Sequence, residues 1–184
     1  MRPLTAFSYQ GQRVALRICS LLTLLVLMFF CSCISDEPAQ EGNLVVGDPL
    51  PTFHVTMNDG STVCTADLLG GVSVIVFFSV ECGDCRTELP EVQRLWDLHP
   101  GVPVVLIARE NTEEQISSFW QQERFTMIYS PQSDRKVYSL FASSRIPRIY
   151  ISDAQGVIRF SHADDAMPSA EQMADEIKTL NMKD

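Results

Sequence analysis

Two cysteines separated by two residues, Cys82 and Cys85, carry the clearest capacity for chemistry in this sequence. Such a pair can be a redox centre, half of a metal site or two buried thiols. The pair follows residues 72–79, an apolar run rich in β-branched residues that predicts a strand buried on both faces. Apolar side chains at helical spacing come after Cys85 and predict a helix. Cys82 should therefore lie where a buried strand delivers the chain to the first turn of a helix.

This position suits thiol-disulfide exchange, which needs one thiolate that attacks and a second thiol that resolves the mixed disulfide. Unpaired backbone N–H groups at a helix N-terminus favour the thiolate, so Cys82 is expected to attack. Cys85, about one turn further along, is expected to be more buried and to close the ring. Glu88 lies one more turn on. It is either a partly buried carboxylate that holds or relays a proton near the thiols or an ordinary exposed helix acid.

The other cysteines and histidines favour metal or additional redox chemistry less. Cys64 lies in a predicted hairpin with no thiol near it in sequence, and we expect it to be buried and inert. A zinc site would need ligands from the scattered His54, His99 and His162, because no second pair of this spacing exists. A copper-delivery site would need a longer cysteine spacing and a matching histidine. We therefore expect no metal and no organic cofactor.

The N-terminal segment predicts export. Arginines precede residues 18–30, an apolar run that is short for a membrane-spanning helix and typical of a signal peptide. The run ends in Cys31-Ser32-Cys33, which resembles the lipobox of bacterial lipoproteins. That resemblance implies lipidation of Cys33, with Cys31 as the alternative residue. An uncleaved anchor and ordinary secretion are the other interpretations.

We accordingly divide the chain into a signal peptide over residues 1–33, a flexible polar tether over 34–46 and a folded domain over 47–182. The domain is expected outside the cytoplasm, on the periplasmic side or cell surface, held to a bacterial membrane only by lipid. The net charge is −9, and the first 33 residues hold three arginines and no acid, so 11 basic and 23 acidic residues remain. So acidic a body argues against nucleic acid as a partner.

The alternation of predicted elements indicates an α/β fold. A hairpin around Asn58-Asp59-Gly60 comes first, and the order β-α-β-α-β-α-β-β-α follows. The strands are predicted over residues 72–79, 102–108, 125–129, 148–152 and 157–162. A capping box of Thr112 and Gln115 predicts the start of the second helix. This order implies a mixed sheet with helices on both faces.

Four segments resemble the exported TlpA/ResA-like thiol-disulfide oxidoreductases of the thioredoxin fold: residues 47–60, "VIVFFSVECGDC" at 74–85, "ELP" at 88–90 and "RIPRIYISDAQGVI" at 145–158. The resemblance covers residues 47–181. It implies a thioredoxin-like three-layer sandwich, with a central mixed β-sheet, helices on both faces and an N-terminal β-hairpin extension. It also implies a cis peptide bond before Pro147. That bond would turn the backbone of Ile146 toward the cysteines, where an extended client peptide can pair with it.

The sequence departs from this family at Glu81, where a bulky apolar residue is usual, and in the dipeptide Gly83-Asp84 between the cysteines. Negative charges near a sulfur disfavour its thiolate, so we expect a reducing or isomerising enzyme and not an oxidase. Its clients would be thiols and disulfides of extracytoplasmic proteins, and a membrane-embedded thiol relay would supply the electrons. Two alternatives stay open. One is a peroxiredoxin-like thiol peroxidase, although the expected Pro-x-x-x-Thr-x-x-Cys approach is absent; the other is a non-catalytic binding module of the same fold.

Overall fold

The computed structural model describes residues 43–163 and 167–182. The expected signal peptide, Cys31, Cys33 and the tether up to residue 42 lie outside these residues. Leu44, within the last part of the expected tether, is buried, and its N–H donates to the carbonyl of Phe141 at 2.8 Å. Within the described ranges, no helix combines the length and the apolar character needed to cross a membrane.

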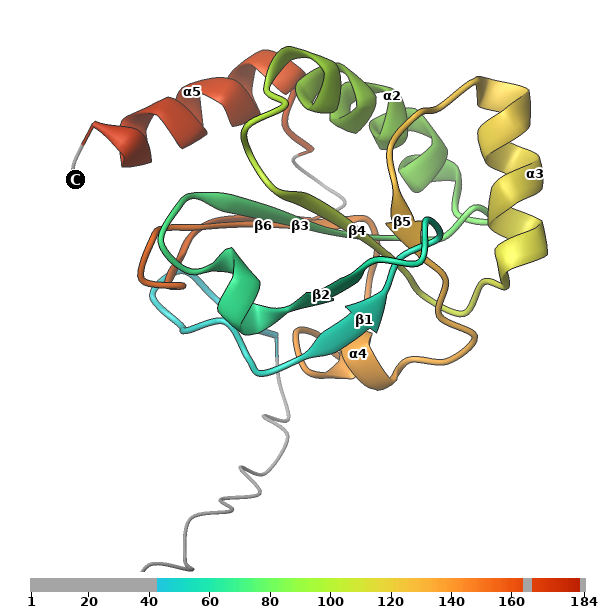
Figure 1. Ribbon diagram of the computed structural model, residues 1–184, viewed down its shortest axis with the longest axis horizontal. Helices are drawn as coiled ribbons and strands as arrows, with labels where there is room; N and C mark the ends of the chain where they lie inside the picture. Colours follow the sequence, from blue (N-terminus) through green and yellow to red (C-terminus); the bar gives the residue numbers. More distant parts are fainter. Residues whose placement is uncertain (1–42, 164–166, 183–184) are drawn as a thin grey trace, which may run out of the picture. The chain divides into compact units, whose positions relative to one another are not determined.

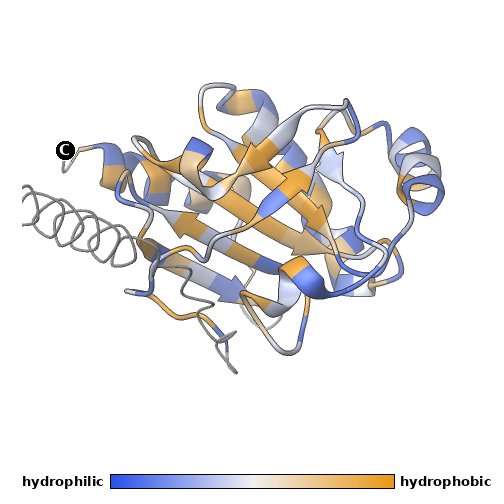
Figure 2. Cartoon of the chain, turned by 60° about the horizontal axis from the view of Figure 1, so that its bottom comes forward, coloured by the Kyte–Doolittle hydropathy of each residue, from blue (hydrophilic) through white to orange (hydrophobic). Residues whose placement is uncertain are grey.

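A five-stranded mixed sheet forms the centre of the domain, with the strand order β5-β4-β3-β6-β7 (Figure 1). The central strand β3 pairs with β4 in parallel and with β6 antiparallel. The strands are β3 (Ser73–Phe78), β4 (Val104–Ala108), β5 (Tyr129–Ser130), β6 (Arg148–Ser152) and β7 (Ile158–Ala163). A separate antiparallel pair consists of β1 (His54–Thr56) and β2 (Thr62–Cys64). The central strands are the most apolar part of the domain (Figure 2).

Helices cover both faces of this sheet (Figure 1). They are α2 (Gly83–Leu98), α3 (Glu113–Glu123), α4 (Lys136–Ser139) and α5 (Ala170–Asn181), with a short 3₁₀ helix η1 (Thr65–Leu68). Successive side chains of a strand point to opposite faces. Phe77 of β3 accordingly contacts Tyr138 of α4, and the next residue, Phe78, contacts Trp120 of α3. The predicted three-layer architecture with an N-terminal hairpin is confirmed.

The element order matches the prediction, but the predicted strand over residues 125–129 is largely wrong. Only Tyr129 of that range belongs to β5. The preceding residues are held by α3 instead of a neighbouring strand. The Phe125 ring packs edge-on against Trp120, and the indole N–H of Trp120 donates to the carbonyl of Met127 at 2.9 Å. Because of this packing, residues 125–128 do not pair with β4, and strand pairing begins only at β5.

Candidate redox site

A short bend carries the chain from β3 to the cysteine pair, and residues on both sides hold it. The N–H of Val80 donates to the side-chain oxygen of Asn111 at 3.0 Å, and Asn111 is fully buried between β4 and α3. From α2, Nε of Arg86 donates back to the carbonyl of Val80 at 2.6 Å. The Arg86 guanidinium also lies over the ring of Phe119, 5.1 Å from its centre. The approach to Cys82 is therefore fixed by α2 itself and by the loop after β4.

Cys82 is the N-cap residue of α2, where the sequence predicted the first turn. Its Sγ accepts a hydrogen bond from the N–H of Cys85 at 3.4 Å, and its thiol donates to the carbonyl of Ile146 at 3.5 Å. Both cysteines are free thiols, with Cys82 half-buried and Cys85 buried. One sulfur can thus be reached from outside while the other lies behind it.

Cys85 is 0% exposed. Burial raises the pKa of Cys85 far above its ordinary value, and the hydrogen bond with Cys82 raises it further. The backbone of Ser79 and the positive charge of Arg109 act in the opposite direction. The Cys85 thiol therefore stays protonated at neutral pH unless a neighbouring base removes its proton.

Glu88 is a buried carboxyl group, not an exposed helix acid: it is 5% exposed and lies one turn after Cys85. Burial raises the pKa of Glu88 from its ordinary value of 4.5 to about 7, and the negative charge of Glu91 adds to the rise. Its Oε1 has no hydrogen-bond partner among the described residues. A carboxyl group that titrates near neutral pH can both accept and return a proton.

The loop before β6 brings Ile146 to the cysteines. The Ile146–Pro147 peptide bond is cis, as the family resemblance implied. The hydroxyl of Tyr138 donates to the carbonyl of Arg145 at 2.6 Å and so fixes the residue before Ile146. The carbonyl of Ile146, 3.5 Å from Cys82 Sγ, is the polar backbone group that the loop presents to the redox pair.

Arg109, the residue after β4, is a cation near the redox pair that the sequence analysis did not single out. Its guanidinium carbon lies 5.3 Å from the centre of the Tyr138 ring, and its Nε is buried with no hydrogen-bond partner within the part of the chain that the structure describes. That Nε lies 3.9 Å from a carboxylate oxygen of Glu110. Arg109 therefore connects the buried Cys85, whose pKa it lowers, with the ring that holds the loop before β6.

The expectation for Cys64 is wrong in one respect, because this residue is half-buried. It ends β2 and caps η1, opposite His54 in the two-stranded sheet, and its N–H donates to Asp67 at 2.8 Å. Among residues 43–163 and 167–182, no group of three or more His, Cys, Asp or Glu side chains is arranged to hold a metal ion.

The fold and the position of the two thiols define the class of protein: a thioredoxin-fold domain with a dithiol at a helix N-terminus. The sequence profile of the AhpC/TSA family matches residues 46–161, which is more than half of the chain. The chain belongs to the AhpC/TSA family.

Two relatives found by sequence comparison have names that describe thiol-disulfide chemistry. The thiol-disulfide oxidoreductase ResA of Oceanobacillus iheyensis is 26% identical over 145 residues, which are 76% of each chain. The thiol:disulfide interchange protein DsbE of Pseudomonas fluorescens biotype C is 31% identical over 75 residues, 40% of this chain and 42% of that one. The enzyme class expected from the sequence, a thioredoxin-like thiol-disulfide oxidoreductase, is confirmed.

Solved structures agree on the fold. A thiol:disulfide interchange protein of Chlorobium tepidum TLS superimposes with a TM-score of 0.63 at 19% identity, covering 74% of this chain and 98% of that one. StoA from Bacillus subtilis gives a TM-score of 0.60 at 19% identity, covering 75% and 98%.

Proposed function

We propose that this protein reduces or isomerises disulfides of extracytoplasmic proteins through Cys82 and Cys85. The observation that carries the proposal is the geometry of the pair: a reachable Cys82 sulfur, 3.4 Å from the Cys85 N–H and 3.5 Å from the Ile146 carbonyl, in front of a buried second thiol. An extended client segment can pair with the backbone beside Ile146 and Pro147 while its sulfur meets Cys82.

The reaction has two exchange steps. The Cys82 thiolate attacks a client disulfide, so that a mixed disulfide forms and one client sulfur leaves as a thiolate. Cys85 then attacks the Cys82 sulfur, the internal disulfide forms, and the second client sulfur leaves as a thiolate. The client gains two electrons and the enzyme loses two. A membrane-embedded thiol relay is the electron donor that we propose for returning the enzyme to its dithiol form.

Glu88 is the proposed base for the second step. Cys85 must lose its proton before it can attack, and burial raises its pKa far above neutrality. Glu88 lies one helical turn away and titrates near pH 7. Its carboxylate, directly or through one water molecule, would accept the Cys85 proton, and its acid form would return it when the pair is reduced again.

The charged residues around the redox pair support the proposed reducing direction. Strong oxidants of this fold owe their high potential to a reduced form stabilised by an acidic thiol. The residues beside this pair are the acidic Glu81 and Asp84, and negative charges near a sulfur disfavour a thiolate. Glu81 and Asp84 are exposed, so water and salt screen their charges and weaken this effect on the sulfur. We expect a potential in the range of thioredoxin, roughly −270 mV, and a glutathione titration that gave a value above about −170 mV would contradict this direction.

We place the domain outside the cytoplasm, attached to a bacterial membrane through lipid on Cys33 and through nothing else. The support is the sequence: an apolar run of signal-peptide length that ends in Cys31-Ser32-Cys33. We further propose residues 1–33 as the part removed or modified on export and the polar segment that follows as the spacer to the domain.

Two assays test the proposed activity against its alternatives. The full chain should accelerate insulin reduction by dithiothreitol, and Cys82→Ser should abolish the acceleration. A non-catalytic binding module would show none with either chain. Peroxide consumption, measured in parallel, should stay at the level of Cys82→Ser, and a rate at least tenfold above it would favour a peroxidase. Mass spectrometry of disulfides trapped on Cys85→Ser would then identify the clients.

A further inference from the structure

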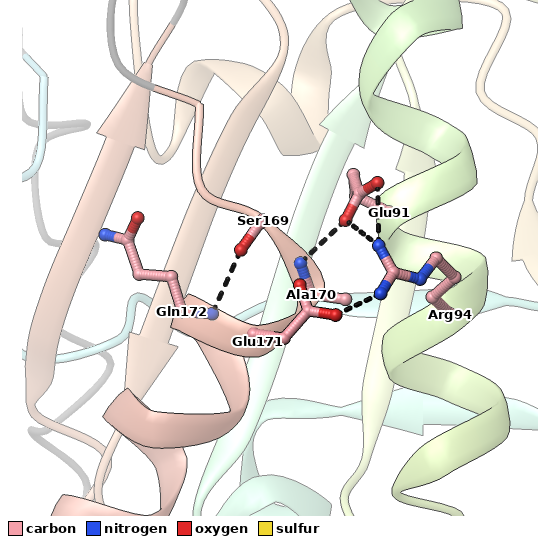
Figure 3. Close-up of polar contacts among 6 residues, drawn as sticks. All are labelled: Glu91, Arg94, Ser169, Ala170, Glu171 and Gln172. Carbon is pink, nitrogen blue, oxygen red and sulfur yellow. Dashed lines mark hydrogen bonds and ion pairs between the residues drawn. The ribbon is translucent and has the colours of Figure 1, made fainter.

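The N-terminus of α5 is fastened to α2 one helical turn beyond Glu88 (Figure 3). The Glu91 carboxylate accepts two hydrogen bonds from Nη1 of Arg94, at 3.1 and 2.9 Å, and one from the N–H of Ala170, at 2.8 Å. The second terminal nitrogen of Arg94 binds the carboxylate of Glu171. We call Glu91, Arg94, Ala170 and Glu171 the α2–α5 clamp.

The clamp lies next to the buried carboxyl group of the redox site. Glu88 and Glu91 are three residues apart on α2, and side chains with this spacing are neighbours on a helix surface. Glu88 is 5% exposed and its Oε1 lacks a hydrogen-bond partner among the described residues, so little screens it from a neighbouring charge. The effect of the Glu91 charge on Glu88 depends in turn on how completely Arg94 and the α5 N-terminus offset that charge.

Other charged groups on the elements around α2 are engaged elsewhere. His162 of β7 and Glu176 of α5 bind each other at 2.9 Å. Arg148, at the start of β6, donates to the carbonyl of Ser144 at 3.0 Å. Arg109, after β4, acts on Cys85. Glu91 is the charged residue that disfavours ionisation of Glu88.

We propose that the α2–α5 clamp sets the proton affinity of Glu88 and thereby the pH range in which the redox pair works. Arg94 and Glu91 are positioning residues in this arrangement, since neither touches the sulfurs. The inference rests on the proposed function for its consequence in catalysis, but the link between the clamp and Glu88 can be measured by itself.

The test is a pH titration of the Glu88 carboxyl carbon by NMR in the full-length chain, labelled in its glutamates and assigned with Glu88→Gln. Glu91→Gln removes a negative charge and should lower the titration midpoint of Glu88. Arg94→Gln leaves Glu91 less offset and should raise it. Each shift of the midpoint should be about 0.15–0.4 pH units, given the energy of a helix pair at this spacing.

The opposite signs of the two midpoint shifts distinguish an electrostatic effect on Glu88 from a loss of packing between α2 and α5. If both substitutions only weakened the docking of α5, water would reach Glu88 and both would lower its midpoint. Asp97→Asn is the matched control, because it removes a negative charge from the same helix about two and a half turns from Glu88. It should leave the midpoint of Glu88 unchanged. Arg94→Lys should restore most of the wild-type value. Any of three outcomes would overturn the inference. Glu91→Gln and Asp97→Asn could shift the midpoint equally, both clamp variants could shift it in the same direction, or Glu91→Gln could leave it unchanged.

Insulin-reduction rates against pH distinguish this inference from the proposed function. If the midpoint of Glu88 moves in the two directions and the rate profile moves with it, both stand. If the midpoint moves and the profile does not, the clamp sets the proton affinity of Glu88 but not the working pH range, and the role of Glu88 as the base is wrong. A wild-type chain without reductase activity would refute the proposed function and leave the NMR result to decide the clamp.

Discussion

Glu88 makes the stability of the domain depend on pH. Its pKa is about 7 in the folded chain and ordinarily 4.5, so between these values the folded state binds more protons than the unfolded state. The free energy of unfolding should therefore fall as the pH rises from about 4.5 to 7, by up to about 3 kcal/mol from this group. Glu88→Gln cannot ionise and should lose that part of the pH dependence.

Urea unfolding of the reduced protein at pH 5 and pH 8 measures this effect. We expect Glu88→Gln to be stabilised relative to the wild type at pH 8 by clearly more than at pH 5, while Asp97→Asn shows no such difference. Equal effects of Glu88→Gln at the two pH values would show that the buried group does not titrate as described.

The two thiols should differ sharply in their reaction with alkylating reagents. Cys82 is half-buried, whereas Cys85 is 0% exposed and its burial raises its pKa. In a Cys64→Ser background at neutral pH, iodoacetamide should label Cys82 at least tenfold faster than Cys85, as read by mass spectrometry of peptides. The assignment of attacking and resolving cysteine would be reversed if Cys85 reacted first.

A local pattern in the sequence predicted the candidate site residues that lie close together along the chain, and the family resemblance predicted Ile146 and Pro147. Neither marked Arg109 or Asn111. Cys82, Cys85 and Glu88 follow one another at the spacing of one helical turn, so a local pattern contains them. Arg109 and Asn111 reach the site only because β4 pairs with β3 in a register that places Ala108 opposite Phe78. No local pattern encodes such a register, and nothing near these two residues in sequence marks them.

At the scale of elements, the loop after β4 supports the bend before α2 through one buried side chain. Asn111→Ala removes the acceptor for the N–H of Val80 and should lower the free energy of unfolding by about 1–3 kcal/mol. Because this hydrogen bond holds the approach to Cys82, the substitution should also change the alkylation rate of Cys82.

The neighbouring residue supplies the control. Thr112 caps α3, and its hydroxyl accepts a hydrogen bond from the N–H of Gln115 at 3.4 Å, within α3 itself. Thr112→Ala should cost about 1 kcal/mol of stability and leave the alkylation rate unchanged. If the two variants altered the rate equally, general loosening would explain the result better than the hydrogen bond to Val80.

Elements with a strong local signal were predicted well. The capping box of Thr112 and Gln115 is present at the start of α3, and the apolar run over residues 72–79 contains β3. The segment before β5 shows where such signals stop: its apolar residues serve as partners for Trp120 instead of forming a ladder. An apolar run predicts burial, whereas its strand pairing depends on which elements the fold places beside it.

For the molecule as a whole, the main prediction is attachment to the membrane through lipid. Lipid on Cys33 should send the full-length chain into the detergent phase of a phase-partition experiment after expression in a bacterium. Cys33→Ala should move most of it to the aqueous phase or leave it in an unprocessed form, and Cys31→Ala is the control. Release by Cys31→Ala alone would make Cys31 the lipidated residue, and release by neither would refute the lipobox interpretation.

The two edge strands of the central sheet affect whether copies of this domain aggregate at high concentration. A free strand border is a template on which other chains can assemble. On one border, β5 has only two residues, and the proline that follows has no N–H to donate. The Tyr129 N–H already donates to the side-chain oxygen of Asn58 at 3.0 Å, and the Tyr129 carbonyl accepts from the Asn58 N–H at 2.8 Å. On the other border, the pairing of β7 is irregular near Ile151 and Ser152, and the strand carries the charged Arg159. Both borders are poor seeds for fibre growth, so molecules concentrated on a surface should remain separate and keep their thiols open to clients.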